Sequence, residues 1–211
     1  GNDTADGTSS ATAWRTFPYA LARLTPGDLL LVEPGTWTSE DGGVLDATCP
    51  SLAQNGTADG GTITVRSTLE RQAHIVSNGP LPAARINGCS HWSLEGLFLE
   101  RNDFESLGNF PSTARVNDSH RISLRRVLTL RNNRAIEQAN PAVSVDSSTD
   151  VLIEDCEMYD FSNDGLRVWN PSHLGDGSPE VTVHGLVDVG EKGRLRGVWK
   201  DGDEVTVAAP E

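Results

Sequence analysis

Residues 92–99 read Trp-Ser-Leu-Glu-Gly-Leu-Phe-Leu, two short runs in which apolar residues stand at alternate positions. The same pattern returns at 122–129 as Ile-Ser-Leu-Arg-Arg-Val-Leu-Thr and at 151–158 as Val-Leu-Ile-Glu-Asp-Cys-Glu-Met. A fourth copy starts at Val181, so the steps between copies are 30, 29 and 30 residues. Alternation with a period of two is typical of a strand with one buried face, so each copy predicts two consecutive β-strands.

A second alternating segment repeats at a similar spacing. Its central residues are apolar and stand 30, 29 and 23 residues apart: Ile86, Val116, Val145 and Val168. Each repeat therefore contains about three short strands, and stacked repeats would pair every strand in parallel with its copies above and below. The sequence thus predicts an all-β protein, a right-handed parallel β-helix that forms a solenoid of about six to seven coils.

The first series also extends toward the N-terminus. Ile63 stands 29 residues before Trp92, and Leu30 stands 33 residues before Ile63. We therefore expect the strands of this series to begin near residues 30, 63, 92, 122, 151 and 181. Helical repeats fit less well, because these segments alternate and lack a period of 3.6.

The composition fits this architecture. The chain of 211 residues contains 21 glycines and 11 prolines, which suit many short strands separated by turns. No apolar run approaches the roughly 20 residues that cross a bilayer, so we expect no membrane span. A formal charge of −13 disfavours a nucleic-acid partner, because binding phosphates requires a basic surface.

The chain has three cysteines, Cys49, Cys89 and Cys156, and none of them forms a C-x-x-C motif. A zinc site is therefore disfavoured. Cys156 occupies an aliphatic position of the repeat and is predicted to be a small core residue. Cys49 and Cys89 would pair if the chain is exported, and the sequence leaves that question open.

Three regions are predicted along the chain. Residues 1–28 form an N-terminal cap, because stacked coils would otherwise expose an apolar end. Residues 29–189 form the parallel β-helix. Residues 190–211 depart from the repeat and form either an atypical terminal coil or a truncated end.

A short amphipathic helix is expected within the cap, in residues 14–24. Thr16 is a suitable N-cap, and Pro18 is tolerated in the first turn. Three apolar residues fall on one face of this helix: Phe17, Leu21 and Leu24.

The beginning of the chain also carries a series of short motifs. They are Gly1-Asn-Asp-Thr-Ala-Asp-Gly-Thr8, Trp14-Arg-Thr, Ala20-Leu-x-x-Leu24, Pro26-Gly-Asp28 and Pro34-Gly-Thr-Trp37. This series resembles the entry to the pectate-lyase-like right-handed parallel β-helix superfamily. The resemblance implies an exported protein, secreted or at the cell surface, that handles polysaccharide or oligosaccharide. Its motifs are specific for architecture and carry little information about chemistry.

In this superfamily the cleft runs along one parallel sheet and its flanking turns, and we assign it here to the second strand series. With the central apolar residues of that series inward, alternation turns their neighbours outward. One outward column is Arg85, Arg115, Ser144 and Arg167. The other is Asn87, Asn117, Asp146 and Trp169.

These columns contain the candidate site residues. Stacked arginines repel one another unless an anion lies between them, and a uronate would supply that anion. Arg115 and Arg167 are therefore the predicted neutralisers of a substrate carboxylate. A glycoside hydrolase would instead need two carboxylates, for which Asp146 and Asp164 are the best pair. The predicted substrate-binding residues are Arg85, Asn87, Asn117 and Trp169, the last by stacking on a sugar ring.

A structural interpretation competes with this one. The two asparagines and Asp146 would form a ladder of hydrogen-bonded side chains between coils. The arginines would pair with surface acids, as we also expect for Arg125 and Arg126 between Glu95 and Glu154 of the adjacent repeats.

Residues 159–169 are a candidate calcium-binding segment. This segment resembles the Asp-Asp-Gly-x-Asp sequence that binds calcium in one pectate lyase family, but only Asp164 and Gly165 match. Asn163 and Arg167 replace carboxylates, and an arginine opposes a cation that needs several oxygen ligands. We therefore expect no metal and no cofactor.

The function that these observations favour is action on carbohydrate. A lyase of acidic, uronate-containing polysaccharide is favoured over a glycoside hydrolase. The alternative is a non-catalytic module at the cell surface that binds carbohydrate or serves a structural role.

Overall fold

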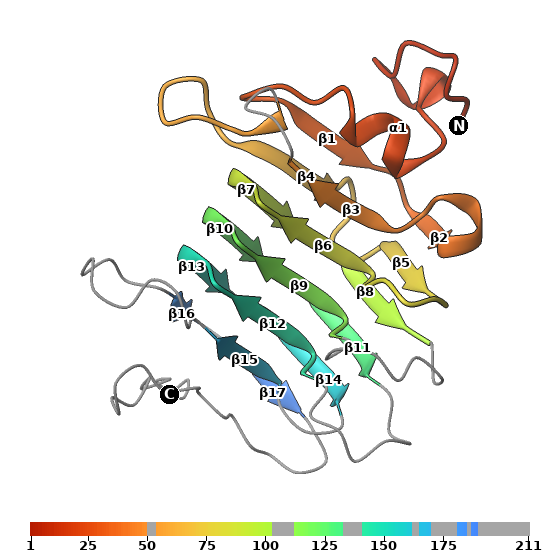
Figure 1. The fold of residues 1–211 in the computed structure, drawn as a ribbon. Helices are drawn as coiled ribbons and strands as arrows, with labels where there is room; N and C mark the ends of the chain where they lie inside the picture. Colours follow the sequence, from red (N-terminus) through yellow and green to blue (C-terminus); the bar gives the residue numbers. More distant parts are fainter. Residues whose placement is uncertain are drawn as a thin grey trace.

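The computed structural model describes residues 1–49, 54–102, 112–132, 141–161, 165–169, 181–184 and 187–189. Almost all regular structure in these ranges is β-strand, arranged in three parallel sheets that the chain visits in turn (Figure 1). The protein is a right-handed parallel β-helix, as the repeats predict. The described strands form five coils of three strands each and two strands of a sixth coil.

The first sheet contains the strands that start each copy of the first motif. They are β1 (Leu29–Val32), β4 (Ile63–Ser67), β7 (Ser90–Glu95), β10 (His120–Arg125), β13 (Thr149–Glu154) and β16 (Val181–His184).

The second sheet follows the first in each coil. Its strands are β2 (Gly35–Thr38), β5 (Ala73–Ser77), β8 (Phe98–Arg101), β11 (Leu128–Asn132), β14 (Glu157–Phe161) and β17 (Val187–Val189).

The third sheet closes each complete coil. Its strands are β3 (Leu45–Thr48), β6 (Ala84–Asn87), β9 (Ala114–Asn117), β12 (Val143–Asp146) and β15 (Leu166–Trp169).

The core lies between the three sheets and is made by the alternate apolar residues of every strand. In the first sheet Trp92, Ile122 and Val151 pair in register and are each 1% exposed. The four central residues of the second strand series are also buried, from Ile86 at 0% to Val168 at 7%. The alternation read from the sequence therefore identifies the inward face correctly.

The corners of the coils are tight because single residues adopt a left-handed backbone conformation. Between the third and first sheets these residues are Gly88, Asp118 and Ser147, with φ of 63°, 49° and 46°. A positive φ is easiest for glycine, which has no Cβ, and aspartate is among the other residues that tolerate it. The repeat pattern of the sequence does not predict these corner conformations.

The register of the first coil differs from the prediction. Leu30 pairs with Val65 and not with Ile63, so the step is 35 residues and not 33. Three successive leucines begin β1, so its sequence lacks the polar positions that would fix the pairing. A slip of two residues also leaves every side chain on the same face, which makes it invisible to a pattern of alternation.

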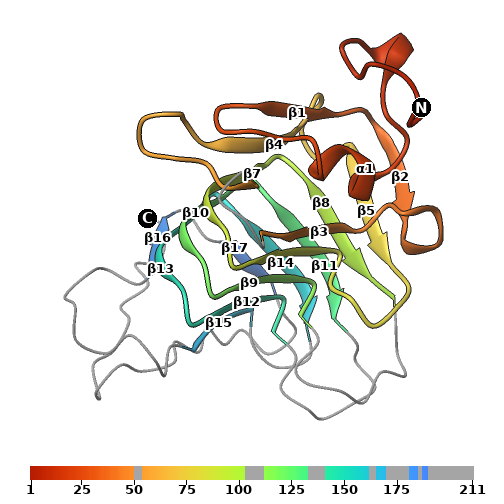
Figure 2. The same ribbon diagram turned by 45° about the horizontal axis from the view of Figure 1, so that its top comes forward.

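The N-terminal cap contains α1 (Phe17–Leu21), which Figures 1 and 2 place across the first coil at that end of the stack. Thr16 is its N-cap, and its hydroxyl accepts a hydrogen bond from the Tyr19 N–H at 3.4 Å. Phe17, Leu21 and Leu24 are buried, as predicted. The helix is shorter than the expected 14–24. The cap also contains a 3-10 turn at Ser10–Thr12, and a second 3-10 turn, Ser39–Asp41, lies between β2 and β3 of the first coil.

Other expectations can be compared directly. Cys49 and Cys89 form a disulfide, while Cys156 is a buried free thiol. Arg125 lies 3.4 Å from Glu154, and Arg126 lies 3.7 Å from Glu95, so the cross-strand ion pairs are confirmed.

The described part of the chain contains no helix with the length and apolar character needed to span a bilayer. Residues 190–211 lie outside the described residues, so the prediction for the terminal coil stays a prediction.

Candidate functional site

The candidate site occupies the outer face of the third sheet, where the two predicted columns run across four strands, β6, β9, β12 and β15. Parallel pairing aligns Arg85 with Arg115, Arg115 with Ser144, and Ser144 with Arg167. The second column aligns Asn87, Asn117, Asp146 and Trp169 in the same way. The structure therefore brings together seven of the eight site residues that the sequence predicts. The eighth, Asp164, lies outside the described residues.

Arg85 is already neutralised within the protein. Its Nε and Nη2 each lie 2.7 Å from an oxygen of the Asp46 carboxylate, so the two side chains form a bidentate ion pair. Asp46 is its partner in register on β3. The repeat spacing does not reveal Asp46, because the first coil is longer, with a step of 39 residues from Ala47 to its partner Ile86. The alternating segment of the first coil, Leu-Asp-Ala-Thr at 45–48, is the sequence pattern that could have revealed Asp46.

Arg115 and Asp146 form the central charged pair. Arg115 Nε lies 3.0 Å from Asp146 Oδ2, although this N–H is not aligned for a hydrogen bond. About a third of the Arg115 side chain is exposed, against 16% of the Asp146 side chain. The guanidinium therefore keeps N–H groups on its two terminal nitrogens that can face a ligand.

Burial raises the pKa of the Asp146 carboxyl above its ordinary value. The charges of Arg115 and Arg167 act in the opposite direction, and the nearby Asp118 carboxylate adds to the rise. The effect of desolvation on the pKa is larger than the opposing effect of the two cations, because the carboxylate is partly buried. A carboxyl group with a raised pKa is a better proton acceptor near neutral pH than an exposed one.

The side-chain ladder of the competing structural interpretation is present in part, because it joins the two asparagines while Asp146 pairs with Arg115 instead. Asn117 Nδ2 donates a hydrogen bond to Asn87 Oδ1 in the preceding coil, and the same nitrogen lies 3.2 Å from Asp118 Oδ2. These two asparagines therefore stabilise the stack whatever else they bind.

Trp169 is available for contact with a ligand. It is 52% exposed, and it follows Asp146 in the same column, one coil further on. Ser144 is less accessible, with 1% exposure and its hydroxyl 3.0 Å from that of Ser112. Arg167 is also buried, at 9% exposure, so the accessible part of the site centres on Arg115, Asp146 and Trp169.

The residues of the described ranges offer little to a metal ion. They contain no group of three or more His, Cys, Asp and Glu side chains arranged to hold one. Because Asp164 falls outside those ranges, the paired-carboxylate arrangement of a hydrolase stays a prediction.

No protein-family model matches the sequence, and neither does any curated protein. Solved structures with a similar fold include a pectin methylesterase in complex with a hexasaccharide, with 10% identity and a TM-score of 0.47 over 86% of this chain and 78% of that one. A rhamnogalacturonan lyase has 13% identity and a TM-score of 0.47 over 90% of this chain and 60% of its own. A family 6 polysaccharide lyase from Pseudopedobacter saltans has 15% identity and a TM-score of 0.43 over 82% of this chain and 44% of its own. The chain also spans 65% of a second pectin methylesterase structure, so it is shorter than these proteins.

Proposed function

We propose that the protein binds an acidic polysaccharide along the outer face of the third sheet and cleaves it by β-elimination. The observation that carries the proposal is the Asp146 carboxylate, whose pKa is raised by burial and which lies 3.0 Å from the Arg115 guanidinium. This arrangement supplies a proton acceptor beside a group that neutralises a substrate carboxylate. Elimination from a uronate needs both groups at one place.

The proposed reaction begins when the carboxylate of a uronate contacts the terminal nitrogens of Arg115, with Arg167 contributing positive charge behind it. Neutralisation makes the neighbouring C5 proton more acidic, and Asp146 accepts that proton. The electron pair forms the C4–C5 double bond, the C4–O bond breaks, and the departing oxygen takes a proton from solvent. The products are an unsaturated uronate and a new chain end.

The remaining residues position the sugar chain in this proposal. Trp169 offers an exposed aromatic face on which a neighbouring sugar can stack. Arg85 has an exposed fraction of 31% and lies one coil before Arg115, where it would contact a further uronate beside its own Asp46. A secreted or cell-surface location belongs to the same proposal. The Cys49–Cys89 disulfide supports it, because such bonds persist in oxidising compartments.

The test incubates the protein with alginate, pectate and glycosaminoglycans and follows the ultraviolet absorbance of the unsaturated product. We expect one of these polymers to give a signal, and Asp146→Asn to lower the rate by at least about a hundredfold. The matched control is Arg121→Ala, because Arg121 forms a similar ion pair with Asp150, at 3.2 Å, on the first sheet. Arg115→Ala should reduce the rate strongly and Arg121→Ala should leave it unchanged. Chelation of metals should also have no effect, because the proposal includes no cofactor.

A non-catalytic carbohydrate-binding module is the second candidate, and one observation favours it. Arg85 and Asn87 already have partners within the protein, as expected of a surface built for stability. Binding of a polymer without product, weakened by Trp169→Ala and Arg115→Ala, would support this candidate against the lyase. New reducing ends without the unsaturated product would instead indicate the hydrolase.

A further inference from the structure

The N-terminal edge of the first sheet has an open side. Strand β1 pairs with β4 alone among the described strands, in parallel. The Thr64 N–H donates a hydrogen bond to the Asp28 carbonyl at 2.9 Å. The backbone groups of Leu30 and Val32, two and four residues after Asp28, continue this pairing with β4. Because backbone groups of successive strand residues point to opposite edges, those of Leu29 and Leu31 point away from β4.

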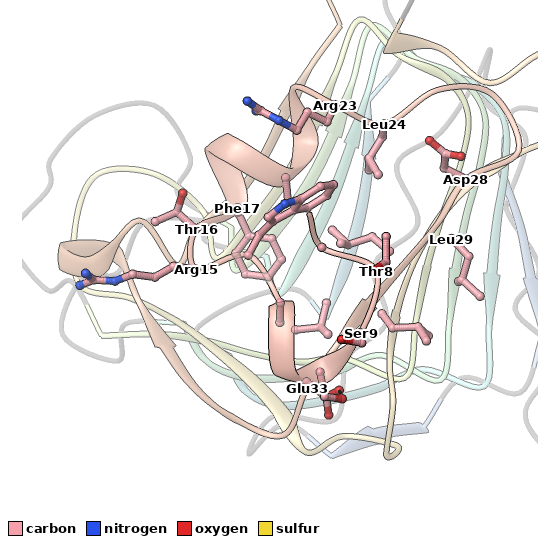
Figure 3. A pocket seen from close by; sticks show the side chains of 18 of the residues that line it. Thr8, Ser9, Arg15, Thr16, Phe17, Arg23, Leu24, Asp28, Leu29 and Glu33 are labelled. Carbon is pink, nitrogen blue, oxygen red and sulfur yellow. Dashed lines mark hydrogen bonds between the residues drawn. The ribbon is translucent and has the colours of Figure 1, made fainter. Parts of the chain in front are cut away.

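A cavity of about 560 Å³ lies along this open edge. All four residues of β1 line it. Successive side chains of a strand face opposite sides of its sheet, so four consecutive lining residues mean that the cavity follows the backbone edge. The facing wall comes from the cap and includes three large apolar side chains, Trp14, Phe17 and Leu24. Figure 3 shows the last two of them beside the cavity. The Trp14 indole N–H donates to the Ala5 carbonyl at 3.0 Å, which fixes the ring within the cap.

The ends of the cavity are acidic. Asp28 precedes β1 and Glu33 follows it, and Figure 3 shows them on different sides of the pocket with Leu29 between them. Asp28 accepts hydrogen bonds from Thr25, and Glu33 accepts one from the Ser10 hydroxyl and one from the Thr68 hydroxyl. Neither carboxylate forms an ion pair with another described residue.

Two arginines also line the cavity, and both are engaged elsewhere. Arg15 lies 3.9 Å from the Asp41 carboxylate. The Arg23 guanidinium carbon lies 3.2 Å from the centre of the Tyr19 ring, and its Nη1 donates to the Tyr19 carbonyl. The charge that the two ends of the edge present to an occupant is therefore negative.

We propose that this cavity binds an extended peptide segment of a partner protein, which adds to the edge of β1 as a further strand. Backbone hydrogen bonds to Leu29 and Leu31 would hold the segment, and alternate apolar side chains would enter the cavity beside Trp14 and Phe17. Basic residues at the two ends of the segment would face Asp28 and Glu33. Leu29 and Leu31 are 46% and 49% exposed, so an added strand would also cover apolar surface of β1 itself.

A second copy of this chain fits the edge less well. Antiparallel pairing of two β1 strands about a two-fold axis would bring Asp28 of one copy close to Glu33 of the other at both ends. Like charges at that spacing oppose association, and the net charge of −13 adds to the repulsion.

The test is calorimetric titration of the protein with a blocked peptide, Lys-Val-Thr-Val-Thr-Val-Lys. We expect binding, and we expect a glutamate-flanked version to bind at least about tenfold more weakly. A version methylated on alternate backbone nitrogens should not bind, because it cannot form the edge hydrogen bonds. No binding of the lysine peptide, or equal binding of the methylated one, would overturn the proposal.

Variants of the protein localise the contact. Leu31→Pro removes the outward N–H of this residue and leaves the β4 pairing in place, so we expect about tenfold weaker binding. Leu31→Ala keeps the N–H and is the matched control, with a smaller loss. Glu33→Gln should weaken only the lysine-flanked peptide, by about threefold. Circular dichroism checks that Leu31→Pro is folded. If this variant is not folded, the methylated peptide still tests the edge hydrogen bonds on the unaltered protein. If the protein self-associates and Leu31→Pro abolishes that association, the edge binds a second copy of this chain, and the peptide proposal is refuted.

Discussion

Loss of the disulfide between Cys49 and Cys89 should destabilise the N-terminal end of the stack. Cys49 follows β3 and Cys89 comes two residues after β6, so the bond joins the first two coils at one corner. The sequence separation is 40 residues. In the chain-entropy description, opening a loop of that length returns about 4 kcal/mol of freedom to the unfolded chain. With about 2.1 cal/mol/K of unfolding entropy per residue over 211 residues, the melting midpoint should fall by about 9 °C.

The assay is thermal unfolding of the oxidised protein, of the reduced protein, and of the Cys49→Ala/Cys89→Ala variant. Reduction and double substitution should lower the midpoint by similar amounts, and reductant should have no further effect on the variant, which is the control. Thiol titration of the unfolded, unreduced protein should find one group, Cys156. A count of three thiols, or a midpoint that reduction leaves unchanged, would refute the reasoning.

Three further predictions concern single side chains. Burial raises the pKa of folded Asp146, so its contribution to stability is present below its ordinary value of 3.8 and is lost as the pH rises through the folded pKa. Asp146→Asn should therefore be more stable than the unaltered protein at pH 7, with the difference disappearing in acid, and a variant of equal or lower stability at pH 7 would contradict the burial argument. Ile122→Ala, at a position that is 1% exposed, should cost about 3 kcal/mol in urea unfolding, whereas the outward neighbour Ser123→Ala should cost less than about 1 kcal/mol. Thr16→Ala removes the N-cap of α1 and should cost about 1 kcal/mol, and an unchanged midpoint would show that the cap adds nothing to the stack.

Much of the candidate site could be read from the sequence because a strand obeys a local rule. Once Ile86 and Val116 are assigned to the core, alternation places Arg85 and Arg115 on the opposite face. The rule does not say which outward residues already have partners. Asp46, which neutralises Arg85, comes from a coil of different length and so escaped the periodicity. The ion pair between Arg115 and Asp146 depends on side-chain conformations that no spacing specifies.

The sequence by itself determined the coil length, the number of strands in a coil, the buried face of each strand and the presence of a capping helix. The first three properties follow from contacts that recur every 29 or 30 residues, so the pattern of one repeat predicts that of the next. The helix follows from its own local pattern of an N-cap and one apolar face. Only the tertiary structure decided the pairing of Leu30 with Val65, the neutralisation of Arg85 by Asp46 and the cavity along the open edge of β1. Each of these involves the first coil or its cap, where the repeat is interrupted and the chain meets partners that periodicity does not specify.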